Sequence, residues 1–143
     1  LRCGGVTEHA SLSVGALVLG TGLACSRSAK KAEPVASLST SPRAAAEFAQ
    51  LREAWDARTL DRQAAADFIA RHPRDGAVPL AKIYLAFAMM DSGQLVHADG
   101  VLGALGDLPP GATRDLATVA RARSLRLHGA PQSALDSLRP LVE

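Results

Sequence analysis

Three pairs of residues, each a small side chain followed four positions later by a large apolar one, recur along this chain of 143 residues. The pairs are Ala64 and Phe68, Ala98 and Leu102, and Ala134 and Leu138. Successive alanines are 34 and 36 residues apart, which is the period of stacked helical hairpins. Such hairpins cannot bury their apolar faces alone, so they stack and present an extended surface to partners. The spacing therefore predicts an all-α array.

Composition and charge support this fold class and exclude one class of partner. Aromatic residues make up only 3% of the chain, and abundant alanine suits close helix packing better than a strand-rich core. Residues 44–143 carry 11 basic and 12 acidic side chains. Nucleic acid binding needs a concentrated basic stripe, so we expect no nucleic acid partner.

The N-terminal segment has the pattern of a targeting signal. An apolar run covers residues 10–24 and is interrupted by Ser, Gly and Thr. It is shorter than the roughly 20 residues that a membrane span needs, and it fits the hydrophobic region of a secretory signal better. We therefore expect residues 1–24 to be a signal peptide.

The end of this run, Leu23-Ala24-Cys25-Ser26, resembles the cleavage site of bacterial lipoproteins. The resemblance implies that Cys25 is lipidated, and Ser26 in place of Asp implies the periplasmic face of the outer membrane. One departure is Gly22, where the family usually has a large aliphatic residue. Two alternatives stay open: a signal that is not of the lipoprotein type, and an uncleaved anchor.

Residues 25–42 are small, polar and basic, with two prolines. Such a composition buries too little apolar area to offset the entropy cost of ordering, so it predicts a flexible linker. The folded part is then expected to cover residues 43–143.

Apolar periodicity and capping residues predict six helices in this folded part. Their expected ranges are 43–57, 61–71, 78–92, 94–105, 113–128, and a sixth helix beginning at 131. Ser41 and Asp61 are expected to cap the first two helices, and Gly93 to end the third in a left-handed conformation.

In register, these helices resemble tetratricopeptide repeats, a family of helical-hairpin solenoids that dock other proteins. Gly93 and Gly129 match the turn between the two helices of a repeat, and Pro110 matches the proline that ends one. The packing positions of the family are matched by Ala64, Phe68, Ala86, Ala98, Leu102, Ala122, Ala134 and Leu138. In the first hairpin, Arg52 stands at a small position and Thr59 at the turn glycine, so this hairpin is expected to be a cap. The resemblance implies a solenoid of about three repeats.

Trp55, Tyr84 and Phe87 have two interpretations, as core residues or as side chains lining the concave groove of a peptide-binding array. No catalytic or phosphate-binding motif is present in the sequence. His72, His97 and His128 fall in different hairpins, so we expect no metal site, no cofactor and no enzymatic activity. Arg121, Arg123 and Arg126 are split across helix faces, which favours a solvated surface over an anion-binding strip.

Signal, linker and repeats together resemble bacterial envelope lipoproteins, among them the lipoprotein of the barrel-assembly machinery and the activators of penicillin-binding proteins. The resemblance implies a membrane-anchored scaffold that binds proteins in the cell envelope and takes no small-molecule substrate in this region. The array is expected to continue beyond Glu143. The alternative is that these residues form only the anchor and spacer of a larger protein, whose solute-binding or enzymatic domain lies beyond Glu143.

Overall fold

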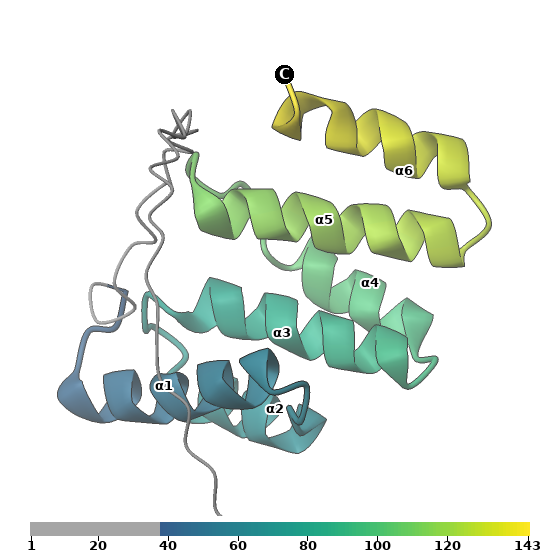
Figure 1. The fold of residues 1–143 in the computed structure, drawn as a ribbon. Coiled ribbons are helices and arrows are strands. Elements are labelled where there is room, and N and C mark those ends of the chain that lie inside the picture. The colour runs from purple at the N-terminus through teal and green to yellow at the C-terminus, as the bar shows by residue number, and fades with distance from the viewer. Residues whose placement is uncertain (1–37) are drawn as a thin grey trace, which may run out of the picture. The chain divides into compact units, whose positions relative to one another are not determined.

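A computed structural model describes residues 38–143, which form an all-α unit with no strand among them (Figure 1). The elements are α1 Pro42–Asp56, α2 Arg62–Arg71, α3 Val78–Asp91, α4 Leu95–Gly103, α5 Ala112–Leu127, α6 Pro131–Leu138 and a short 3₁₀ helix, η2, Arg139–Leu141. The expected all-α class and the six helices are confirmed. The signal peptide, Cys25 and most of the linker lie outside the described residues.

The helices pack as consecutive pairs, α1 with α2, α3 with α4 and α5 with α6. Between pairs, α3 packs against both α1 and α5, while α2 packs against α3 and α4 against α5. Figure 1 shows α1, α3 and α5 following one another through the unit, with α6 against the outer side of α5. Because α3 contacts four other helices, it is the central helix of the described unit.

The first two helices begin and end where their capping residues predict. Ser41 Oγ accepts a hydrogen bond from the Ala44 N–H at 3.2 Å, and Pro42 occupies the first helical position. Asp61 Oδ1 caps α2 by accepting from the Gln63 N–H at 3.1 Å. The helix ends at Arg71 because the residue before a proline, here His72, avoids the helical region.

The predicted helix boundaries lie within one residue of those in the structure, except for the end of the fourth helix. The fourth helix ends at Gly103 instead of residue 105, since Gly100 and Gly103 both disfavour its last turn. The fifth helix begins at Ala112, one residue before its predicted start, and is preceded by Gly111. Gly111 has φ 144°, a conformation that favours glycine and turns the chain into the helix without a side-chain cap.

The three pairs share one backbone motif at the end of their first helix. A residue with positive φ follows each of these helices: Arg58 at 57°, Gly93 at 76° and Gly129 at 81°. In each turn the N–H of that residue and the next N–H bond back to carbonyls of the last helical turn, which defines a Schellman motif. The turn residue of the first pair is therefore Arg58, and the predicted match of Thr59 is wrong.

The connection after this motif is two residues longer in the first pair, because α2 begins four residues after Arg58 whereas α4 and α6 begin two residues after their glycines. Counted from the helix starts, the equivalent small residues are Ala65, Ala98 and Ala134, each the fourth of its helix and each buried. Ala64, which the spacing predicts, is only half-buried. Counted back from the turn residues Arg58, Gly93 and Gly129, the counterpart of Ala86 and Ala122 is Leu51 and not Arg52.

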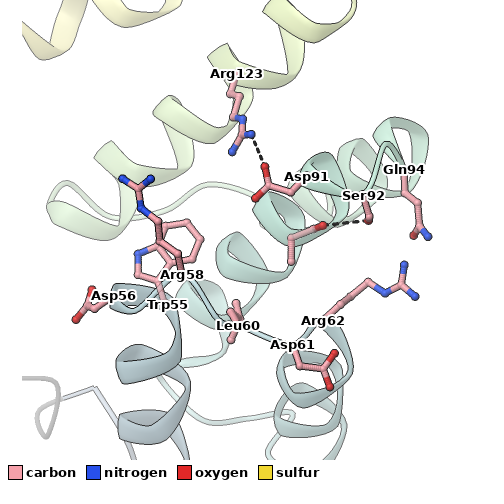
Figure 2. A pocket seen from close by; sticks show the side chains of 11 residues that line it. Trp55, Asp56, Arg58, Leu60, Asp61, Arg62, Asp91, Ser92, Gln94 and Arg123 are labelled. Atoms are coloured by element: carbon pink, nitrogen blue, oxygen red, sulfur yellow. Dashed lines mark hydrogen bonds and ion pairs between the residues drawn. The ribbon is translucent and has the colours of Figure 1, made fainter.

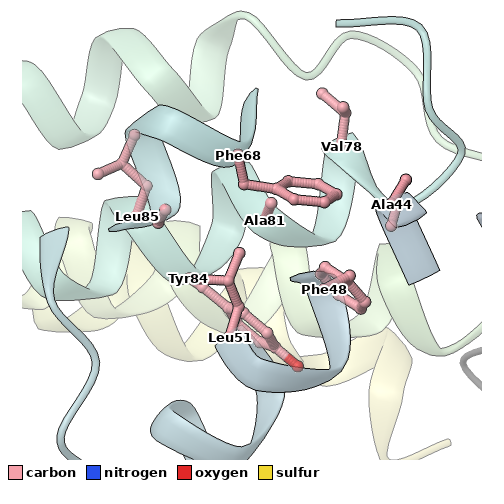
Figure 3. Packing of buried hydrophobic residues seen from close by; sticks show 10 residues of the cluster. Ala44, Phe48, Leu51, Phe68, Val78, Ala81, Tyr84 and Leu85 are labelled. Carbon is pink, nitrogen blue, oxygen red and sulfur yellow. The ribbon is translucent and has the colours of Figure 1, made fainter. Parts of the chain in front are cut away.

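The remaining predicted packing residues lie in the core or at its edge. Phe68, Ala86, Leu102 and Ala122 are buried, and Leu138 is half-buried on the last helix. Figure 3 shows Phe48, Phe68 and Tyr84 packed between α1, α2 and α3, with the Phe48 ring centroid 5.5 Å from that of Phe68. A second cluster joins α3, α4 and α5 through Ile83, Ala86, Met90, Leu102, Ala117 and Ala120.

Residues 38–40, which the sequence assigns to the linker, pack against the connection between α2 and α3. The Thr40 N–H and hydroxyl donate to Asp75 Oδ2 at 2.8 and 2.9 Å, and the Ala77 N–H donates to Asp75 Oδ1 at 2.9 Å. Leu38 packs against the core, and its carbonyl would lie 2.1 Å from a Cβ at Gly76. The ordered unit therefore begins before residue 43.

Candidate docking groove

An open groove of about 1060 Å³ lies between the turns of the first two helix pairs. We call it the turn groove. It is formed by the ends of α1 and α3, the start of α2, the turn before α4 and one side chain of α5 (Figure 2). Its lining residues are Trp55, Asp56, Arg58, Leu60, Asp61, Arg62, Ala88, Asp91, Ser92, Gln94 and Arg123.

The aromatic part of the turn groove is Trp55, which is half-buried. Its ring stacks on Tyr84 with centroids 4.6 Å apart and planes 10° apart, and it lies 5.1 Å from Phe87. Tyr84 and Phe87 themselves are buried, at 5% and 6% exposed, so they are core residues and not groove residues. Of the three aromatic candidates, only Trp55 lines the groove, and the other two hold its ring in place.

The carboxylates of the turn groove all have partners within the protein. Asp91 pairs with Arg123, whose guanidinium also lies 5.5 Å from the centre of the Phe87 ring. Asp56 lies 3.9 Å from Arg52, and Asp61 caps α2.

Two guanidinium groups of the turn groove have no partner in the part of the chain that the structure describes. Among residues 38–143, neither Arg58 nor Arg62 takes part in an ion pair or donates a side-chain hydrogen bond. Both side chains are exposed. In Figure 2 their guanidinium groups lie on opposite sides of Leu60. The groove therefore offers two cations that have no partner among the described residues, in a wall that also contains Trp55.

The three arginines of α5 point to different neighbours. Arg121 Nη2 donates to the Leu102 carbonyl at 3.3 Å, while Arg123 pairs with Asp91 of α3. Arg126 is exposed and forms no ion pair among the described residues. They form no common strip, as their spacing indicates.

The three histidines have different environments. His72 Nε2 lies 3.0 Å from Glu47 Oε2, and Arg71 lies 2.9 Å from the same oxygen. The hydrogen bond from His72, with help from Arg43, holds the pKa of Glu47 below its ordinary value. His97 is exposed on α4. His128 contacts a carboxylate on α4.

That carboxylate, Asp99, joins Ser124 of α5 and His128, the residue that follows α5. Ser124 Oγ donates to Asp99 Oδ1, and His128 Nε2 lies 2.7 Å from Asp99 Oδ2. The serine hydroxyl is bonded to the carboxylate and not to the histidine, so the group lacks the serine–histidine bond of a nucleophilic triad. Its role is to hold α4 against α5. Sequence reasoning missed it because the three residues come together only through packing.

Within residues 38–143, His, Cys, Asp and Glu side chains nowhere gather in threes that would hold a metal ion. None of the helices described here combines the length and apolar character needed to cross a membrane.

No known protein family, curated protein or solved structure matches this chain.

Proposed function

We propose that this chain is a membrane-tethered docking scaffold of the bacterial cell envelope, built from tetratricopeptide-like hairpins. The observation that carries the proposal is the turn groove, an open cavity of about 1060 Å³ with Trp55 in its wall and charged side chains around it. An open cleft with an aromatic side chain and polar groups is typical of a surface that binds another molecule.

The recurring turn geometry supports the repeat part of the proposal. Schellman motifs end α1, α3 and α5, and Gln94 and Ala130 lead into the next helices with nearly the same ψ, 60° and 61°. The equivalent alanines, Ala65, Ala98 and Ala134, let the second helix of each pair approach its neighbours closely. Stacked pairs of this kind present a long continuous surface, which suits a scaffold.

The envelope location is supported by the sequence of the N-terminal segment. In this proposal Cys25 is lipidated and residues 26–37 tether the helices to the membrane. Mass spectrometry of the mature N-terminus tests the anchor: a diacylglyceryl or triacyl group on Cys25 supports it, and an intact Leu1 contradicts it.

A variant that fills the turn groove tests whether a partner docks there, whatever the chemistry of that partner. Ser92 lines the groove and is exposed, so Ser92→Trp fills part of the cavity. Gly100→Trp is the matched control, because Gly100 lies outside the groove and a Cβ there meets nothing within 4 Å. Both variants of the full chain are compared with the wild type for capture of proteins from envelope extract, after circular dichroism shows that they fold.

The proposal predicts that Ser92→Trp loses a captured protein which the wild type and Gly100→Trp retain. Equal capture by all three chains would contradict docking in this groove. Absence of any specifically captured protein would favour the second candidate function, in which these residues are the anchor and spacer of a larger protein. That candidate is favoured by the composition of the linker and by the modest size of the helical unit.

A further inference from the structure

We propose that the turn groove binds an acidic segment of a partner protein, an extended stretch whose Asp or Glu side chains are held by Arg58 and Arg62. The inference rests on the proposed docking function and adds the chemistry of the partner. It depends on three observations: the backbone conformation of Arg58, the pairing of charges in the groove, and the free donors around Trp55.

Arg58 occupies a position where the other two helix pairs use glycine. Among residues 38–143 it is the one residue other than glycine with a positive φ, 57°, in a Schellman turn whose counterparts are Gly93 and Gly129. A residue other than glycine is strained in this conformation, and the Arg58 side chain, which is exposed, forms no ion pair or hydrogen bond among residues 38–143 that would compensate for the strain. The strain places a guanidinium group in the groove, which is the pattern expected of a ligand-binding residue.

The charges of the groove are complementary to an anionic partner. Asp91 is paired with Arg123, Asp56 lies near Arg52, and Asp61 accepts the capping hydrogen bond of α2. Arg58 and Arg62 have no such partners among the described residues. The lining residues carry equal numbers of arginines and aspartates, and Arg52 beside Asp56 adds a further cation, so the groove and its edge together have a net positive charge.

Two further side chains of the groove carry free hydrogen-bond donors, the Trp55 indole and the Gln94 amide. Trp55 Nε1 donates to no acceptor within residues 38–143 and is not among the buried unpaired polar atoms, so solvent or a ligand reaches it. The Gln94 side chain also forms no hydrogen bond in the described unit. Guanidinium groups bind carboxylates through paired N–H donors, and the indole offers an apolar face beside them. A segment that alternates acidic and apolar side chains satisfies both.

Trp55 is the only tryptophan of the chain, so its fluorescence reports directly on the groove. The full chain is titrated with a hexapeptide that alternates glutamate and leucine and is blocked at both ends. A blocked peptide with glutamine for glutamate is the first control. A second control keeps the glutamines and leaves the C-terminal carboxylate free, which separates side-chain carboxylates from a chain terminus.

Three variants accompany the titration. Arg58→Gly removes the guanidinium and keeps the turn, because glycine is the residue used in the equivalent turns. Arg62→Gln removes the second cation. Arg114→Gln is the matched control, since Arg114 is exposed at the start of α5 and lies outside the groove.

We expect saturable binding of the glutamate peptide, weakened about tenfold by Arg58→Gly and by Arg62→Gln, unchanged by Arg114→Gln and reduced by added salt. Equal binding of the blocked glutamine peptide, no effect of either groove variant, or no binding of the glutamate peptide would overturn the inference. Stronger binding of the glutamine peptide with the free carboxylate would also overturn it, in favour of a chain terminus. If these results are negative while Ser92→Trp still abolishes partner capture, docking stands and only the acidic chemistry is wrong.

Discussion

The left-handed backbone conformation of Arg58 lowers the stability of the fold, and a substitution at this position should show the effect. An L-residue in the left-handed region is disfavoured by roughly 1–2 kcal/mol, and the greater freedom of glycine in the unfolded chain offsets part of this. We therefore expect Arg58→Gly to raise the free energy of unfolding by about 0.5–1 kcal/mol, measured by urea denaturation. Thr59→Gly is the control: Thr59 has no positive φ, so glycine there should lower stability. A loss of stability in Arg58→Gly would show that the arginine makes stabilising contacts.

Asp75 is the one buried carboxylate among residues 38–143, and no sequence motif marks it. Its oxygens accept from Thr40 and from the Ala77 N–H. Asp75→Asn replaces a charged acceptor by a neutral one, so we expect a loss of about 1–3 kcal/mol in unfolding free energy. Asp107→Asn, in an exposed loop, should change stability little. Equal effects of the two substitutions would contradict the role of Asp75 in ordering residues 38–40.

The same carboxylate predicts how stability depends on pH. Burial raises the pKa of Asp75, but the hydrogen bonds from Ala77 and Thr40 lower it more, so it lies below its ordinary value of 3.8. The pKa of Glu47 is also below its ordinary value of 4.5. The unfolded chain therefore binds more protons in acid, and stability should fall as the pH drops through and below 4.5 and 3.8. Urea denaturation at a series of pH values should show a shallower acid slope for Asp75→Asn than for the wild type.

At the scale of the helices, the sequence predicts the elements well because local signals define them. Ser41, Asp61 and the two turn glycines, Gly93 and Gly129, act within a few residues of themselves, and the structure agrees with each. The predicted register of the first pair is wrong. The prediction assumes a constant repeat period, but the connection between α1 and α2 is two residues longer than those in the other pairs. No local sequence signal marks Arg58 as the residue with the left-handed conformation. The structure was therefore needed to show that Ala65 is the counterpart of Ala98 and Ala134.

Helix α4 carries two glycines that no contact in the described unit explains. A Cβ at Gly100 meets nothing within 4 Å, and its φ is not positive. We therefore expect Gly100→Ala to stabilise the chain by about 0.5–1 kcal/mol through helix propensity. Gly76→Ala should do the opposite, because its Cβ would lie 2.1 Å from the Leu38 carbonyl. Thermal and urea denaturation of both variants check this contrast, and similar effects in the two would contradict it.

Helices α1 to α5 share one connected core, so we expect them to unfold together. Trp55, Leu80, Met89, Val101 and Leu116 pack against both buried clusters. We expect Leu102→Ala to lower the unfolding free energy by about 2–5 kcal/mol, since Leu102 is 2% exposed. Because the clusters are joined, Trp55 fluorescence and far-ultraviolet circular dichroism should report the same lowered midpoint. A Trp55 transition that stays at the wild-type midpoint would show that the first pair unfolds independently.

At the same scale, the sequence predicts part of the candidate site. It singles out Trp55, which lies at the end of an apolar stripe and does line the groove. It does not single out Arg58 or Arg62, because isolated arginines in and after a turn look like ordinary solvated charges. Arg58 and Arg62 stand out only once it is known which carboxylates of the groove already have partners. Those partners follow from how α3, α5 and the α1–α2 connection pack together.

The central claim is that a partner lies in the turn groove, and direct cross-linking tests it best. A photo-reactive benzoylphenylalanine is placed at Gln94, inside the groove, or at Gly103, outside it, in the full chain expressed in a bacterial envelope. After irradiation, we predict a discrete cross-linked protein from position 94 that is absent from position 103. The same cross-links from both positions, or a partner trapped only from position 103, would contradict the claim.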